Sequence, residues 1–167
     1  MKKHNRPSKT QSMHRSEELK AMTSVVEQGI GPKFITALLI NPGKRPQKVE
    51  IEPTEAQFRE LIGSTGLEVT PHPFDDYAAI ISVDVEHRDE EEPNRSLSCP
   101  DGALILVFNG SFLIVGDNHE EFCSLTPKQL RRYQIEYHQP EAFAMVGDDI
   151  LIPVPIPDEL VDDPDQA

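Results

Sequence analysis

The chain has 167 residues, an apolar fraction of 37% and a formal net charge of −13. This length fits one domain of ordinary size, and an acidic body is a poor general binder of nucleic acid, because neutralisation of phosphates dominates such affinity. The longest apolar stretches, at 103–108 and 112–115, are too short to span a bilayer, so the sequence predicts no membrane-spanning helix.

Charge and cysteine content indicate the kind of partner and the compartment. Residues 1–20 carry six Lys or Arg and two Glu, whereas the rest of the chain carries 10 basic and 27 acidic residues. An acidic body of this kind suits a protein that meets basic surfaces. Cys99 and Cys123 are too few for a disulfide framework, and no apolar run follows the N-terminal charges. We therefore expect a cytoplasmic protein with no membrane association.

The N-terminal segment, residues 1–32, is predicted to be a basic arm. Within it, residues 16–28 place Leu19, Met22 and Val26 at helical spacing. A short helix and a disordered segment are equally consistent with this stretch. The folded domain is predicted to begin at residue 33.

The first strands of this domain are predicted at 34–40 and 48–52. The first segment is apolar and β-branched, and the second alternates polar with apolar residues. Asn41-Pro42-Gly43 has turn chemistry, so the two segments are expected to form a hairpin.

Two helices are predicted from their start signals. Thr54 and Gln57 have the spacing of a capping box, as do Thr126 and Gln129, and Pro127 suits the first helical position. The first helix is expected to end at Gly63 and the second near His138, with inward-facing side chains at Phe58, Leu61, Ile62, Leu130, Tyr133 and Tyr137.

Further strands are predicted at 67–70, 77–85, 121–124 and 150–152, and residues 86–95 are predicted to form a solvated charged loop. Asn109-Gly110 lies between the apolar runs 103–108 and 111–115. This dipeptide favours a two-residue hairpin, with one long strand bulged at Gly110 as the alternative.

The resulting fold prediction is α+β: a small, mostly antiparallel sheet with two main helices packed on one side of it, plus disordered termini. The links between strands are short, which argues against alternating βαβ units. The predicted domain spans 33–140. Residues 141–167 are predicted to be a Pro-rich acidic tail that is disordered apart from the predicted strand at 150–152, since no basic residue occurs from Gly147 onward.

No catalytic constellation, metal site or cofactor site is predicted. Cys99, His119 and Cys123 match no standard zinc spacing, and the acidic residues at 75–76 and 89–92 are typical of solvated loops. Asn94 and Arg95 form the one candidate binding pair, because a guanidinium can recognise a partner carboxylate with a planar fork of donors. The alternative is that Arg95 binds a local carboxylate or carbonyl and is structural.

Several short motifs follow one another between residues 35 and 138, in the segments 37–44, 49–51, 60–63, 93–95, 110–116 and 122–126. Their order and spacing resemble those of the family labelled domain of unknown function 3846, which occurs in phages, plasmids and other mobile elements. The resemblance implies a mobile-element accessory protein and implies no activity. Residues 87–92 depart from the family pattern, because plain acidic residues replace an Asn-Glu-containing segment.

These observations predict a non-enzymatic accessory protein that acts by binding another protein, through the acidic loop 86–95 or the tails. Three alternatives stay open. The first is association with nucleic acid through the basic arm, the second is an acidic nucleic-acid mimic directed against host defence, and the third is an enzyme with an unrecognised site.

Overall fold

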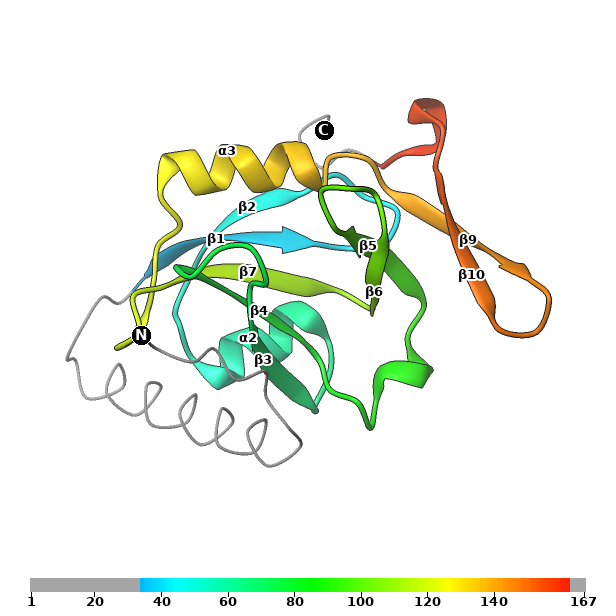
Figure 1. Ribbon diagram of the computed structural model, residues 1–167. Helices are drawn as coiled ribbons and strands as arrows, with labels where there is room; N and C mark the ends of the chain where they lie inside the picture. The colour runs from blue at the N-terminus through cyan, green and yellow to red at the C-terminus, as the bar shows by residue number, and fades with distance from the viewer. Residues whose placement is uncertain (1–33, 163–167) are drawn as a thin grey trace, which may run out of the picture.

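The computed structural model describes residues 34–162. The predicted basic arm at 1–32, with its short helix at 16–28, lies outside the described residues. The centre of the described chain is a six-stranded antiparallel sheet in which the order is β2-β1-β7-β4-β3 and β8 pairs with β7 (Figure 1). Its strands are β1 (Ile35–Ile40), β2 (Gln47–Ile51), β3 (Leu67–Pro71), β4 (Ala78–Val83), β7 (Phe112–Asp117) and β8 (Phe122–Cys123).

Two further antiparallel ribbons complete the strands of the described part. One pairs β5 (Pro93–Ser98) with β6 (Leu104–Asn109), and the other pairs β9 (Glu141–Val146) with β10 (Ile150–Pro155). The helices are short: α2 (Glu55–Ile62) has 8 residues and α3 (Pro127–Glu136) has 10. Single 3-10 turns lie at η1 (Arg88–Glu90) and η2 (Asp158–Leu160).

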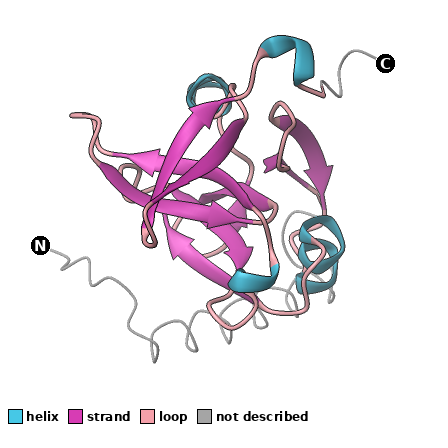
Figure 2. Cartoon of the chain, turned by 90° about the vertical axis from the view of Figure 1, so that its right-hand side faces the viewer, coloured by secondary structure: helices cyan, strands magenta, loops and turns pink. Residues whose placement is uncertain are grey.

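The α+β prediction is therefore wrong for the described chain, which is mostly antiparallel sheet (Figure 2). The two helices also lie on opposite faces of the main sheet rather than on one side. Phe58 and Ile62 of α2 pack with one core cluster, whereas Tyr133 of α3 packs with the other. The error arose because both helices have strong local start signals, while several strands have polar or exposed sequences that resemble loops.

The central strands are buried on both faces, which explains their continuous apolar sequences. Along β1, Ile35, Ala37 and Leu39 face the cluster on the α2 side, and Leu38 and Ile40 face the other. This alternation follows from the two-residue period of a strand. The second face is covered by α3 together with the β5–β6 ribbon, so the main sheet is the middle layer of three.

The predicted hairpin of the first two strands and both predicted helix starts are confirmed. Strands β1 and β2 pair antiparallel. Thr54 Oγ1 accepts a hydrogen bond from the backbone N–H of Gln57 at 3.1 Å, and α2 ends at Gly63, where φ is +77°. At α3, Thr126 and Gln129 form the complete capping box.

The predicted hairpin at Asn109-Gly110 is wrong, and so is the bulged-strand alternative. Strand β6 pairs with β5, and β7 pairs with β1 and β4, so this turn carries the chain from one layer to another. Gly110 has a φ of +76°, which suits glycine. The side-chain amide of Asn94 donates to the carbonyls of Gly110 and Ile40, at 2.8 and 2.9 Å, and so holds the turn against β1.

Two segments predicted to lack structure contain strands. Residues 93–95 of the predicted solvated loop begin β5, and most of the predicted unstructured tail forms the β9–β10 ribbon, which includes the predicted strand at 150–152. The chain then returns to the body. Arg45 binds Asp158 at 3.0 Å, and Lys44 forms a parallel bridge with Asp162. Residues 163–167 lie outside the described part.

Candidate functional site

The predicted binding pair, Asn94 and Arg95, lies in the interior, with exposures of 0% and 1%. The Arg95 guanidinium donates to the Asn94 side-chain carbonyl at 2.8 Å and to the main-chain carbonyls of Tyr137 and Lys44. Burial lowers the pKa of Arg95 to about 10. The group joins β5, the end of α3 and the β1–β2 loop. This geometry favours the structural alternative, and partner binding by the pair stays a prediction.

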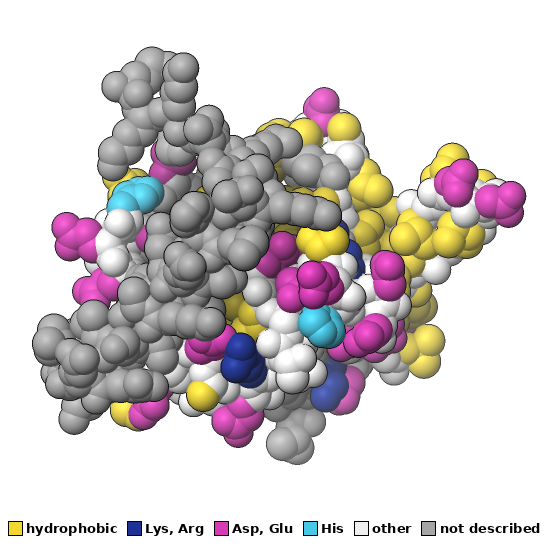
Figure 3. Space-filling model, turned by 90° about the horizontal axis from the view of Figure 1, so that it is seen from below, with side chains coloured by type: hydrophobic (Ala, Val, Ile, Leu, Met, Phe, Trp, Pro, Cys, Tyr) yellow, Lys and Arg dark blue, Asp and Glu magenta, His cyan; other side chains and the backbone are white. Residues whose placement is uncertain are grey.

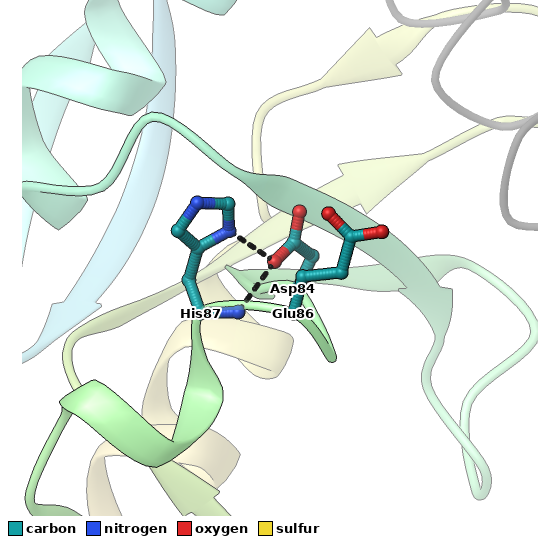
Figure 4. Close-up of side chains that lie close together, drawn as sticks. All are labelled: Asp84, Glu86 and His87. Atoms are coloured by element: carbon teal, nitrogen blue, oxygen red, sulfur yellow. Dashed lines mark hydrogen bonds and ion pairs between the residues drawn. The ribbon is translucent and has the colours of Figure 1, made fainter.

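A group of potential metal ligands lies in the loop after β4. Among residues 34–162, Asp84, Glu86 and His87 are the one set of three His, Cys, Asp or Glu side chains whose ligand atoms all lie within 4.8 Å of one another (Figure 4). Cys99, His119 and Cys123 therefore form no such set, nor do the acidic residues at 75–76 and 89–92. Sequence spacing drew attention to the neighbouring acidic run and missed this group.

The contacts within this group also explain it as a loop-stabilising unit. Asp84 Oδ1 accepts hydrogen bonds from the His87 backbone N–H at 3.0 Å and contacts His87 Nδ1 at 2.7 Å (Figure 4). The hydrogen bond with Asp84 and its negative charge raise the pKa of His87. A Cβ at Gly66 would collide with the side chains of Asp84 and His87, so a larger residue there would force this pair to move. The three ligand atoms could hold a divalent cation, and its binding would displace a proton from His87 Nδ1.

A second polar network attaches α3 to the loop between β3 and β4. Asp75 accepts hydrogen bonds from the Tyr133 hydroxyl, from Gln129 Nε2 at 3.1 Å and from the Tyr77 backbone N–H at 2.9 Å. Burial raises the pKa of Asp75, but these hydrogen bonds outweigh it and lower the pKa overall. The contacts of this network fix the helix on the sheet.

His72 lies beside this network and is 3% exposed. Its ring lies 5.0 Å from that of Tyr133, its Nδ1 accepts a hydrogen bond from the Phe74 backbone N–H at 3.1 Å, and its buried Nε2 has no partner. Burial lowers the His72 pKa to about 4, so the ring is neutral at physiological pH. We assign it a packing role.

Several of the exposed large hydrophobic side chains of the described chain lie together on the β9–β10 ribbon, which projects from the body (Figure 1). Strand alternation places one set of residues on its outer face, called here the ribbon face: Ala142, Ala144, Val146, Ile150, Ile152 and Val154. The four largest, Val146, Ile150, Ile152 and Val154, are 49%, 59%, 43% and 45% exposed. Figure 3 shows hydrophobic side chains along the projecting arm, with acidic groups at its tip.

The outer edge of β10 is poorly suited to further strand pairing. The Ile156 N–H donates to the Pro140 carbonyl at 2.8 Å. Because backbone N–H groups along a strand alternate in direction, the nitrogens of Ile150, Ile152 and Val154 also point toward β9. Pro153 and Pro155 occupy the intervening positions, whose nitrogens point outward. Because proline has no N–H, this edge offers an incoming strand few donors. The ribbon face, rather than the edge, is therefore the surface open to a partner.

The inner side of the ribbon borders a groove of about 500 Å³. Phe143 and Leu151 line it from the ribbon, and Glu92 and Glu141 are also among the lining residues. Both carboxylate oxygens of Glu141 accept from the Ser96 hydroxyl, at 2.9 and 3.0 Å, so this side chain also fixes the ribbon to β5. The remaining lining residues are Pro42, Gly43, Pro93, Ala142 and Ile156.

The charged side chains of the ribbon and of the segment after it are all acidic. From residue 139 to the end of the chain there is no Lys, Arg or His, while Asp148 and Asp149 are exposed at the ribbon tip. At the base of the ribbon, Arg45 binds Asp158, the Gln139 side chain and the His138 carbonyl, and Lys44 pairs with Asp162. The ribbon face therefore combines apolar contact area with unbalanced negative charge.

Comparison with protein families matched residues 35–138 to the family described as Domain of unknown function (DUF3846). The ribbon lies outside these matched residues. Comparison with curated proteins found no match, and comparison with solved structures found none. No helix in the part that the structure describes is long and apolar enough to cross a membrane.

Proposed function

Because the chain belongs to the family described as Domain of unknown function (DUF3846), whose description assigns no activity, we propose a function from the geometry. The protein is a non-enzymatic accessory protein that binds another protein through the ribbon face. In line with the family resemblance, it serves a phage, plasmid or other mobile element, and it works in the cytoplasm. Its two free cysteines suit a reducing compartment.

The observation that carries this proposal is the exposure of the ribbon face. Its six positions are all apolar, and four of them hold β-branched side chains that are about half exposed. Full burial of one such side chain contributes about 2 kcal/mol, so covering the exposed halves of four contributes about 4 kcal/mol. A contiguous apolar patch of this kind marks an interaction site more often than an inert surface.

The roles of the other polar groups support a binding rather than a catalytic function. Arg95 is committed to carbonyls and an amide oxygen, and Asp75 and Tyr133 are committed to each other. The Cys123 pKa is raised by burial, which opposes formation of the reactive thiolate. Each of these groups is accounted for by the packing of α3, β5 or β8.

The test is partner capture from cells that carry the element, using the full chain and two variants. Ile150→Asp with Ile152→Asp places charges on the ribbon face, and Ile135→Asp places one on the exposed side of α3, where Ile135 is 72% exposed. We expect proteins retained by the wild type to be lost from the ribbon variant and kept by the α3 variant. All three chains should melt at similar temperatures, because the altered side chains are exposed.

Identical partners for the wild type and the ribbon variant would contradict the proposal. A second comparison addresses the basic arm: if removing residues 2–20 abolishes retention of DNA or RNA at low salt, and the ribbon variant behaves as the wild type, nucleic-acid association becomes the better account.

A further inference from the structure

We infer that the partner presents a basic amphipathic helix, which lays an apolar stripe on the ribbon face and directs Lys or Arg side chains at the carboxylates around it. This inference rests on the proposed function and adds the chemistry of the partner. It follows from three features of the ribbon: its charge, its donor-poor edge and its length.

The acidic groups around the ribbon face have few basic neighbours. Asp148 and Asp149 are exposed at the tip, and Glu159 is exposed just beyond the base. Glu92 and Glu141 line the groove on the opposite side of the ribbon, so they do not contribute to the charge around the ribbon face. Arg45 is engaged with Asp158 at 3.0 Å. A partner with positive charge on either side of an apolar stripe would complement this arrangement.

The shape of the ribbon favours a helix over an added strand. Pro153 and Pro155 leave the outer edge of β10 with few donors, which disfavours recognition by strand addition. The face is six residues long, or about 20 Å at about 3.3 Å per residue. A helix covers that length with about 13 residues, presenting apolar side chains three and four residues apart.

The same charges disfavour a second copy of this chain as the occupant. Face-to-face packing of two ribbons would bring together segments that contain no Lys, Arg or His from residue 139 onward. Each ribbon would bring Asp148 and Asp149 into the interface, and neither ribbon has a basic side chain to neutralise them. Like charges across an interface cost free energy and act against the pairing.

The experiment measures fluorescence anisotropy of three labelled synthetic peptides titrated with the full chain. Each peptide has about 14 residues, the length of the ribbon face. The first has a Leu stripe flanked by Lys, the second has the same stripe flanked by Glu, and the third is a scramble of the first without a stripe. We expect the first peptide alone to bind, and its affinity to fall as salt increases.

Variants of the chain separate the apolar and the charged contributions. Ile150→Asp with Ile152→Asp should weaken binding of the Leu/Lys peptide by about tenfold or more, as expected for central contacts. Asp148→Asn with Asp149→Asn should weaken it by about threefold to tenfold at low salt. The matched control, Glu52→Gln with Glu120→Gln, removes the same charge from exposed positions elsewhere in the chain, and should leave the affinity unchanged.

The outcomes distinguish this inference from the proposed function. Equal binding of the Leu/Glu peptide would overturn the basic partner while leaving an apolar docking face. Absence of peptide binding would also overturn it, and sedimentation that shows a dimer abolished by Ile150→Asp with Ile152→Asp would then identify a second copy as the occupant. An equal loss of affinity for the Leu/Lys peptide in the Glu52 and Glu120 control would overturn it as well, because the attraction between peptide and protein would then depend on net charge rather than on Asp148 and Asp149. The proposed function is tested separately, and identical partners for the wild type and the ribbon variant in the capture experiment would contradict it whatever the peptides show.

Discussion

The buried ring of His72 should make the stability of the protein depend on pH between about 6.5 and 4. The ordinary pKa of 6.5 applies in the unfolded chain, and burial lowers the folded value to about 4. The unfolded state therefore binds more protons as the pH falls below 6.5, and stability is lost until the folded pKa is reached. Each unit of difference is worth about 1.4 kcal/mol, so the loss approaches about 3 kcal/mol, with about 2 kcal/mol already lost at pH 5.

The perturbation is His72→Asn. The Asn carbonyl can replace Nδ1 as the acceptor for the Phe74 N–H, which His72 holds at 3.1 Å, and it does not titrate. The smaller side chain will lower stability at every pH, so the informative quantity is the change in unfolding free energy between pH 7 and pH 5. That change should be smaller in the variant by about 2 kcal/mol.

Urea denaturation at the two pH values measures this quantity. The matched control is His138→Asn, because the His138 side chain is exposed. The control should keep the pH dependence of the wild type. Equal pH dependence in His72→Asn and the wild type would refute the reasoning, since it would mean that His72 is protonated as easily in the folded state as in the unfolded one.

Two further substitutions test the interior. Replacing Arg95 by Met should cost about 1–3 kcal/mol in urea denaturation, because it leaves the buried carbonyls of Tyr137 and the Asn94 side chain without this donor. Arg59→Met on the surface should change stability by less than about 0.5 kcal/mol. A loss at Arg95 as small as that at Arg59 would contradict the structural role. Replacing Gly66 by Ala should cost about 1–3 kcal/mol, because the new Cβ would collide with Asp84 and His87. The cost should shrink when both of those residues are also Ala, and an unchanged cost would place the strain elsewhere.

Local signals in the sequence were sufficient for elements whose partners are close in the chain. The caps at Thr54 and Thr126 and the β1–β2 hairpin depend on residues within a few positions of one another. The role of Asn109-Gly110 depends on β5, a partner that the sequence did not indicate. Because β5 begins with Pro93, Asn94 and Arg95, its sequence resembles that of a solvated loop. The carbonyls that accept hydrogen bonds from Arg95 come from distant parts of the chain and meet only in the folded protein.

The ribbon was hidden for a different reason. Its residues are apolar on the exposed side, so the sequence lacks the alternation of polar and apolar residues that identifies a half-buried strand. Prolines and acidic residues around it are typical of disordered tails. The feature that reveals it is the pairing of Ile150 with Val146 across the turn at 147–149, which only the structure supplies. The group of Asp84, Glu86 and His87 was likewise obscured by the more acidic run that comes after it.

The central claim is that the ribbon face contacts a partner protein, and site-specific photo-crosslinking tests it most directly. A photoreactive amino acid placed at Ile152, on the ribbon face, is compared with one placed at Ile135, on the exposed side of α3, in cells that carry the element. The proposed function predicts a discrete covalent adduct from position 152 and none from position 135. Adducts from position 135 alone, or the same adducts from both positions, would contradict it.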